Sequence, residues 1–387
     1  MKKLMLTTAI ASSILMTSAI AQTTITGELR IGYKAISSKK TPSGNVAASA
    51  AGVSTTSTTN QLGSSTAPTY LAVGDAIPAT GKETFGSYGT EQQINIQTKG
   101  KLNVMGLDYA AGFAMENDGD QISTLFNENT YIDLTNASSG TTISFSRDHI
   151  QRSDSDRSAG VLFGFSPNDL SQAEFATTTL FNQNIGAQPG QSYSGAIIQK
   201  LGDFGSVSAM YAPQAGSQAA SEDAIRSTKG AYEYGFLGNL GVKGLEAYYF
   251  ANKDSDTVTT SVVKAEAKSF GAKYNFGQVT VGAAKKEYNA AAAVKAEIGE
   301  QHYGVAYAVD KNLTVGLNYA KADISGPTSG TGARSANSTG TQKVKAIQIG
   351  YALGPVDLTA AFAKNSDMLG VAGNDSDMGM VRLIGKF

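Results

Sequence analysis

The sequence contains no cysteine and no tryptophan among its 387 residues, and it has only 8 prolines and 2 histidines. Without cysteine, the chain forms neither disulfide bonds nor thiolate metal sites, and it cannot use a thiol in catalysis. A formal net charge of −1 argues against a nucleic-acid partner. Beyond the first 21 residues, no segment reaches roughly 18 uninterrupted apolar residues, so the sequence predicts no transmembrane helix.

Motifs for catalysis are also missing. A hydrolase of the Ser–His or Asp–His type needs a suitably placed histidine, and only His149 and His302 are present. The sequence has no Gly-x-Ser-x-Gly turn, no metalloprotease helix and no glycine-rich phosphate loop. Two acidic stretches, 116–121 and 373–378, lack the spacing of a twelve-residue calcium loop. We therefore expect no enzyme activity, no cofactor and no metal site.

The first 21 residues have the pattern of a secretory signal peptide. Lys2 and Lys3 precede a mostly apolar stretch that ends in the small-residue triplet Ala19-Ile20-Ala21. A membrane anchor is the alternative, but the apolar stretch is diluted by Ser and Thr and is too short to span about 30 Å of hydrocarbon. We expect cleavage after Ala21, export, and a single domain over residues 22–387.

Apolar and polar residues alternate with a period of two along most of the chain, as in β-strands. In the first such segment, Leu29 and Ile31 fall on one face and Glu28 and Arg30 on the other. The pattern predicts sixteen strands, near residues 24–35, 90–99, 106–116, 129–135, 141–147, 193–200, 206–213, 230–238, 244–252, 268–276, 278–287, 301–309, 312–322, 342–353, 356–364 and 377–387.

The connections between these strands alternate between tight turns with Gly, Asp, Asn or Pro and longer stretches rich in Ser, Thr, Ala and Gly. The longest is residues 36–89. Short turns at one end and long loops at the other are typical of outer-membrane barrels, as are aromatic residues at strand ends. A soluble β-sandwich is the alternative, but it could not bury apolar faces on all sixteen segments. We predict an all-β, antiparallel transmembrane barrel.

Three stretches and the last residue resemble the general Gram-negative porins. Residues 94–113 contain a strand, a turn and a strand that opens with Gly-Leu, and residues 130–147 end in a strand that closes on Arg. Residues 303–323, YGVAYAVDKNLTVGLNYAKAD, and the terminal Phe387 add to the resemblance. The sequence departs from the family pattern at Thr26-Gly27, where Tyr-Gly is usual, and it lacks the acidic motif of the first turn.

The resemblance implies a homotrimer of water-filled barrels, each narrowed by its third extracellular loop. It also implies that Phe387 is the mark by which the outer-membrane assembly machinery recognises the chain. The stretch between Arg147 and Tyr193 is too long for a simple connection, so we expect residues 148–192 to fold inward as the constriction loop. Ser166 followed by Pro167 and Asp169 predicts a short helix near 167–175 in this loop.

A pore of this kind selects ions by the charges at its narrowest point. By strand phase, the expected wall residues are Glu28, Arg30, Lys34, Asp108, Glu233, Lys273 and Arg382. The expected loop residues are Arg147, Asp148, Arg152, Asp154, Asp156, Arg157 and Asp169, although these could instead form a solvated loop tip. Acids and bases nearly cancel, so the sign of the ion selectivity stays open.

The sequence therefore predicts a porin in the outer membrane of a Gram-negative bacterium, through which small hydrophilic solutes and ions diffuse passively. Its partners would be lipid and lipopolysaccharide, the assembly machinery and two further copies of the chain. A substrate-specific channel is one alternative, although strand phase sends most Tyr and Phe outward rather than into a lumen. A barrel that acts mainly as an adhesin or surface scaffold is the other. The last strand must pair with the first to close the barrel.

Overall fold

A computed structural model describes residues 22–39, 82–102, 106–117, 126–147, 149, 164–167, 170, 181, 193–213, 230–254, 266–289, 297–325, 340–368, 373 and 375–387. The described residues form sixteen strands and a 3₁₀ turn, η2 (Gly202–Phe204). The strands are β1 (Gln22–Lys39), β2 (Lys82–Lys101), β3 (Asp108–Asn117), β4 (Phe126–Asn136), β5 (Thr141–Arg147), β6 (Ser194–Lys200), β7 (Ser206–Ala212), β8 (Ala231–Gly238), β9 (Leu245–Asp254), β10 (Glu266–Asn275), β11 (Val279–Asn289), β12 (Glu297–Ala308), β13 (Leu313–Ser325), β14 (Gly340–Ala352), β15 (Val356–Ser366) and β16 (Asp375–Lys386).

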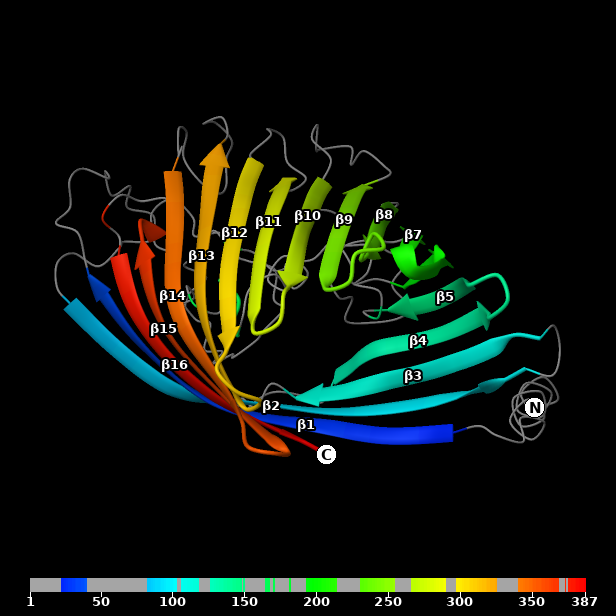
Figure 1. Cartoon of the computed structure of the whole chain (residues 1–387), viewed down its shortest axis with the longest axis horizontal. Helices are drawn as coiled ribbons and strands as arrows, with labels where there is room; N and C mark the ends of the chain where they lie inside the picture. Colours follow the sequence, from blue (N-terminus) through cyan, green and yellow to red (C-terminus); the bar gives the residue numbers. More distant parts are fainter. Residues whose placement is uncertain are drawn as a thin grey trace, which may run out of the picture.

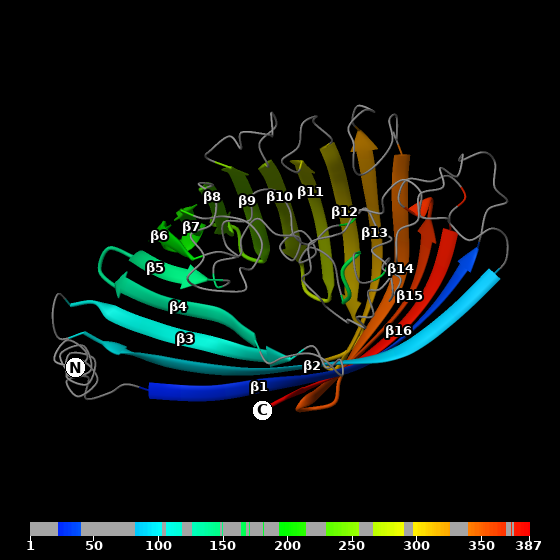
Figure 2. The ribbon, with the colours of Figure 1, turned by 180° about the vertical axis from the view of Figure 1, so that it is seen from behind.

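The strands close into one barrel. Each strand pairs antiparallel with its neighbours in the chain, and β1 pairs with both β2 and β16. The blue, cyan and red strands accordingly lie side by side in Figure 1 and again from behind in Figure 2. The predicted sixteen-stranded antiparallel barrel is confirmed, and the β-sandwich alternative is excluded because no sheet edge remains open.

The seam of the barrel is the pairing of β1 with β16, as the sequence predicts. The ladder runs from Glu28 opposite Lys386 to Lys39 opposite Asp375. Beyond it, the backbone N–H of Gly27 donates to the carbonyl of Phe387 at 2.8 Å, and the N–H of Phe387 donates to the carbonyl of Gly27 at 3.0 Å. The phenyl ring of Phe387 lies over Gly27, where a Cβ atom would meet the ring carbons at 2.2–2.8 Å. The last residue is therefore part of the closed ladder.

Alternation fixes the two faces of the wall. Large apolar side chains point outward and are exposed, among them Leu29, Ile31, Ile347 and Phe362. The residues between them point inward, and many are small, polar or buried. A barrel of about this size leaves a wide interior, so the inward side chains lie around a space rather than filling it.

Tight turns join the strands at one end of the barrel. In the turn between β12 and β13, the Asp310 carboxylate accepts backbone N–H groups of Asn312 at 2.7 Å and Leu313 at 2.9 Å. These two hydrogen bonds favour the ionised carboxylate and lower the pKa of Asp310. Between β8 and β9, Gly244 has φ +85°, and a Cβ there would lie 2.4 Å from the carbonyl oxygen of Asn275. This turn accordingly requires glycine.

The long connection expected at 36–89 is shorter in the structure. The β1–β2 ladder continues to Lys39 opposite Lys82, because the Ser and Thr residues in this region are compatible with a strand. The connection is thus 40–81, which lies outside the described residues, as do residues 1–21 of the expected signal peptide. Within the described part of the chain, no helix is both long and apolar enough to cross a membrane.

The contact between Gly27 and Phe387 yields a stability prediction. We expect Gly27→Ala to lower the free energy of unfolding by about 1 kcal/mol, because the added methyl group displaces the Phe387 ring from its cross-strand position. Gly379→Ala is the matched control: it lies on the same face of the seam with no atom within 4 Å of its added Cβ, so it should be neutral or slightly stabilising. Urea unfolding in lipid vesicles measures both. An equal loss in the two variants, or an undiminished loss for Gly27→Ala in a Phe387→Ala background, would contradict the account.

Candidate functional site

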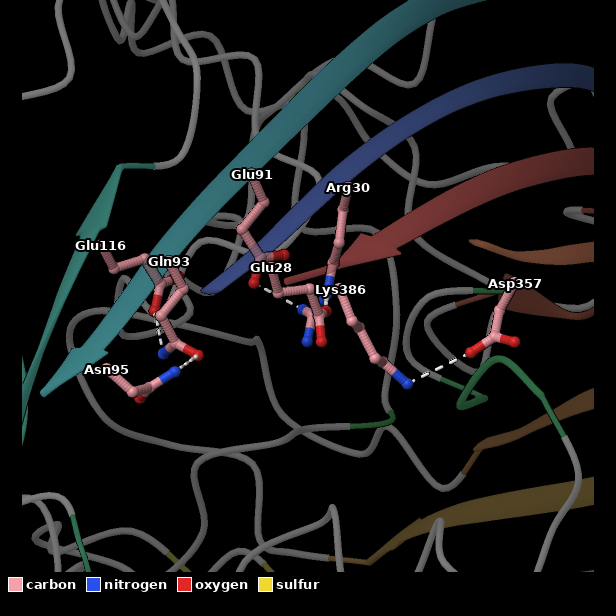
Figure 3. Close-up of polar contacts among 8 residues, drawn as sticks. All are labelled: Glu28, Arg30, Glu91, Gln93, Asn95, Glu116, Asp357 and Lys386. Carbon is pink, nitrogen blue, oxygen red and sulfur yellow. Dashed lines mark hydrogen bonds and ion pairs between the residues drawn. The ribbon is translucent and has the colours of Figure 1, made fainter. Parts of the chain in front are cut away.

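An ion cluster lies on the inward face of β1 and β2. Residues two apart on a strand share a face, so Glu28 and Arg30 point the same way, and the register places Glu91 opposite Arg30. The Arg30 guanidinium donates to both carboxylates, through Nε to Glu28 and through Nη1 to Glu91 (Figure 3). One cation thereby holds two anions at the wall.

A row of amides continues the cluster toward β3. Gln93 Nε2 donates to Glu116 Oε2 at 3.2 Å, and Asn95 Nδ2 donates to Gln93 Oε1 at 3.3 Å (Figure 3). On the other side of β1, Lys386 Nζ donates to Asp357 Oδ2 at 3.1 Å. Polar side chains thus line the inward face of β1–β3 and continue to Lys386 and Asp357 at the short-turn ends of β16 and β15.

Most of the predicted wall residues also lie on the inward face. Lys34 and Glu233 are buried there, and Lys273 Nζ lies 3.6 Å from Glu246 Oε1 on the neighbouring strand. Asp108 lies opposite Lys101 at the short-turn end of β2 and β3. The seventh, Arg382, places its guanidinium carbon 4.5 Å from the centroid of the Phe165 ring.

Arg147 is placed differently from the prediction. It shares a strand face with Ile143 and Phe145, which are both exposed on the outside of the barrel. Its guanidinium carbon lies 5.7 Å from the ring centroid of Tyr193. The expected pore-lining position of Arg147 is therefore corrected, because the parity of β5 turns this side chain outward. Asp148, Arg152, Asp154, Asp156, Arg157 and Asp169 lie outside the described residues.

A second polar group lies on the inward face of β4. The His149 ring stacks on Tyr131, with centroids 3.7 Å apart and planes 6° apart. His149 Nε2 lies 3.3 Å from Asp133 Oδ2, and Tyr131 donates to Gln97 Oε1 at 3.4 Å. Both partners of His149 come from β4, and no motif in the sequence marks this contact.

Three residues from the stretch between β5 and β6 are buried against the opposite side of the barrel. Phe165, Leu170 and Phe181 belong to one apolar cluster with inward residues of β10–β16. The wall members of this cluster are Ala267, Tyr288, Ile298, Ala320, Ala322, Val344, Ala346, Ala361, Ala363, Met378 and Met380. Small and flexible side chains on the wall leave room for the two phenyl rings.

Two buried amides hold the backbone of this stretch. Gln348 accepts the backbone N–H of Phe165 at 2.6 Å and donates to its carbonyl at 3.0 Å, while Asn365 donates to the carbonyl of Leu170 at 2.9 Å. Gly164, at φ +79°, allows this approach because a Cβ there would lie 2.1 Å from Gln348 Oε1.

Of the helix expected at 167–175, only Pro167 and Leu170 lie within the described residues. The N–H of Leu170 donates to the carbonyl of Ser166 at 3.0 Å, with Pro167 in the first position after Ser166. Residues 168–169 and 171–175 lie outside the described residues.

A charged trio is buried beside the same stretch. Lys286 Nζ lies 3.0 Å from Glu300 Oε1, and His302 Nε2 lies 2.9 Å from Glu300 Oε2; their side chains are 0%, 1% and 2% exposed. The ring of Phe181 meets His302 edge-on, with centroids 6.0 Å apart. This trio is not predicted from the sequence. Alternation along β11 and β12, which puts Lys286, Glu300 and His302 on one face, is the signal that could have found it.

The arrangement suits a passage for water and ions and not a chemical reaction. Charged groups neutralise one another in pairs and triplets along the wall, and no group of three or more His, Asp or Glu residues able to hold a metal ion occurs among the described residues.

Comparisons with known proteins point the same way. The family model described as Gram-negative porin matches residues 7–367, whereas no curated protein matches the chain. Among solved structures, OmpF of Salmonella typhi in complex with daunomycin is similar over 94% of this chain and 97% of its own, at 12% identity and a TM-score of 0.60. Two further solved structures share the fold at 12% identity. The outer membrane channel DcaP of Acinetobacter baumannii is similar over 95% of this chain and 98% of its own, with a TM-score of 0.59. An anion-selective porin from Comamonas acidovorans is similar over 95% of this chain and 100% of its own, with a TM-score of 0.58.

The buried trio yields a second stability prediction. We expect Lys286→Met to lower the free energy of unfolding by about 3 kcal/mol, because it leaves the Glu300 carboxylate buried without its main counter-charge. The neighbouring Lys285 forms an ion pair with Glu287 on the outward face, where the two side chains are 42% and 39% exposed, so Lys285→Met should leave the free energy of unfolding nearly unchanged. Urea titration followed by circular dichroism compares the two. Similar losses for both variants would show that burial of the trio does not matter.

Proposed function

The chain belongs to the Gram-negative porin family, and from that premise we propose how its pore is narrowed and how the charges on its wall act. It is an outer-membrane porin of a Gram-negative bacterium: a closed sixteen-stranded barrel through which small hydrophilic solutes and ions diffuse without catalysis. With the short turns on the periplasmic side, the long connections are extracellular.

Residues 148–192 fold inward and narrow the pore. The observation that carries this proposal is the burial of Phe165, Leu170 and Phe181 among inward side chains of strands far from β5 and β6 in the chain. An apolar inner wall facing water would be unfavourable. The segment covers that part of the wall and leaves the charged surface of β1–β4 as the border of the open path.

The pore lining in this proposal comprises the inward charges of the wall and the charges of the loop. The wall contributes Glu28, Arg30, Lys34, Asp108, Glu233, Lys273 and Arg382; the loop contributes Asp148, Arg152, Asp154, Asp156, Arg157 and Asp169. Arg147 is left out because it lies on the outward face. Glu91 is added because it binds Arg30.

Assembly completes the proposal. Porin family membership supports a homotrimer, with lipid and lipopolysaccharide around it and the outer-membrane assembly machinery as the partner that reads Phe387. Residues 1–21 act as the cleaved signal peptide, since their pattern is that of an exported protein.

The Arg30 cluster yields a selectivity prediction. Arg30→Ala should raise the cation-to-anion permeability ratio, measured from the reversal potential in a salt gradient, by about twofold. The reason is that two wall carboxylates lose their shared cation. Glu91→Gln should lower the same ratio. Arg147→Ala is the matched control, since it removes the same charge from the outward face and should leave selectivity unchanged. If Arg147→Ala has the larger effect, the wall cluster does not border the conducting path.

The inward segment yields a conductance prediction. Deletion of residues 150–175 should raise the single-channel conductance in planar bilayers, whereas deletion within the connection 326–339 should not. Gln348→Ala should increase open-channel noise because both hydrogen bonds to Phe165 are lost. Gln348→Glu should be intermediate, since a carboxylate still accepts the N–H but cannot donate to the carbonyl. Unchanged conductance after the first deletion would refute the proposed constriction.

A further inference from the structure

Four lysines form a patch on the outside of the barrel. Lys321 on β13, Lys343 and Lys345 on β14, and Lys364 on β15 alternate with inward residues and therefore point outward. Lys345 and Lys364 are exposed, and Lys321 and Lys343 are half-buried. We call these four residues the lysine patch.

The register places like charges directly opposite each other. Lys321 lies opposite Lys343, and Lys345 lies opposite Lys364. Such cross-strand pairs destabilise a sheet unless an anion lies between them. Two aspartates border the patch: Asp323 Oδ2 is 2.7 Å from Lys321 Nζ, and Asp377 lies opposite Lys364 on β16. The patch retains more positive than negative charge.

Other outward lysines are arranged differently. Lys253 Nζ lies 2.8 Å from Glu266, and Lys285 Nζ lies 2.5 Å from Glu287. Within the described part of the chain, Lys345 and Lys364 form no ion pair, and Lys343 interacts with the charge of Asp323 only from beyond ion-pair distance. The excess charge is thus a property of the patch and not of the whole outer face.

The patch lies immediately beyond the apolar belt. Two residues nearer the short turns on the same faces, Ile347 and Phe362 are exposed, as they would be in contact with lipid chains. Tyr319 lies opposite Lys345 and stacks with Tyr303, with ring centroids 6.1 Å apart. Aromatic residues of this kind mark the boundary between hydrocarbon and headgroups. The patch is therefore at headgroup height, on the side of the long connections.

We propose that the lysine patch binds phosphate groups on the headgroups of outer-leaflet lipids. Phosphate supplies the missing negative charge between the opposed lysines. Acyl chains of the same lipid would lie against the exposed Ile347 and Phe362. A lipid combines both features at the height of the patch, which a soluble anion does not.

Native mass spectrometry of the detergent-purified protein tests the proposal, with diphosphoryl lipid A as the probe. Lys343→Gln combined with Lys345→Gln should weaken binding at least about tenfold, while the double Arg replacement should retain it. Lys253→Gln combined with Lys285→Gln is the matched control: it removes the same charge from the same outer face and should have little effect. Unchanged single-channel conductance verifies that each variant is folded.

Four results would overturn the proposal. One is an equal loss of lipid A binding in the matched control. Another is undiminished binding of lipid A from which the phosphates have been removed. The third is binding of inorganic pyrophosphate as tight as that of the lipid, since the lipid chains would then contribute nothing. The fourth is a change of oligomeric state in the patch variant without loss of lipid binding, which would assign the patch to a second copy of the chain.

Discussion

Within a bilayer no water is available to pair with an open sheet edge, so every backbone N–H and C=O group of a strand in the hydrocarbon region must find a partner in a neighbouring strand. The pairing of β1 with β16 meets that requirement, and it extends to Gly27 and Phe387 at the end of the sequence. Closure also gives the sheet an inside and an outside. Because side chains alternate along each strand, one set lines the polar inner wall and the other set faces lipid. The positions of Arg30 and of the lysine patch both follow from that division.

The strand number, the pairing order, the seam and the inward position of Arg30 could be predicted from the sequence because each depends on local alternation plus closure. Strand ends were less predictable: the Ser-rich residues near Lys39 continue β1, although their composition resembles a loop. The expectation for Arg147 fails for a different reason. The predicted strand 141–147 already ends at this residue, and the parity it shares with Ile143 and Phe145 places it outside, away from the loop charges with which the prediction grouped it.

Contacts across the barrel could not be predicted in this way. Alternation states which face a residue occupies, but not which residue from another segment it meets. Gln348 binds the backbone of Phe165 from 183 positions away in the chain, and no local pattern marks either residue. Lys286, Glu300 and His302 likewise alternate as other inward polar residues do, and no local pattern indicates that they are buried or that Phe181 contacts His302. The surroundings of these inward side chains therefore depend on residues between β5 and β6, where the sequence shows little alternation.

The inward face and the lysine patch balance charge in opposite ways. On the inward face, Arg30 has Glu28 and Glu91, and Lys286 has Glu300, so the wall supplies its own counter-ions. This is necessary because a buried charge without a partner is costly. On the outward face, the register places Lys345 opposite Lys364 with no carboxylate between them. A sheet that keeps this arrangement depends on its surroundings for the missing anion, and at headgroup height those surroundings are the membrane itself.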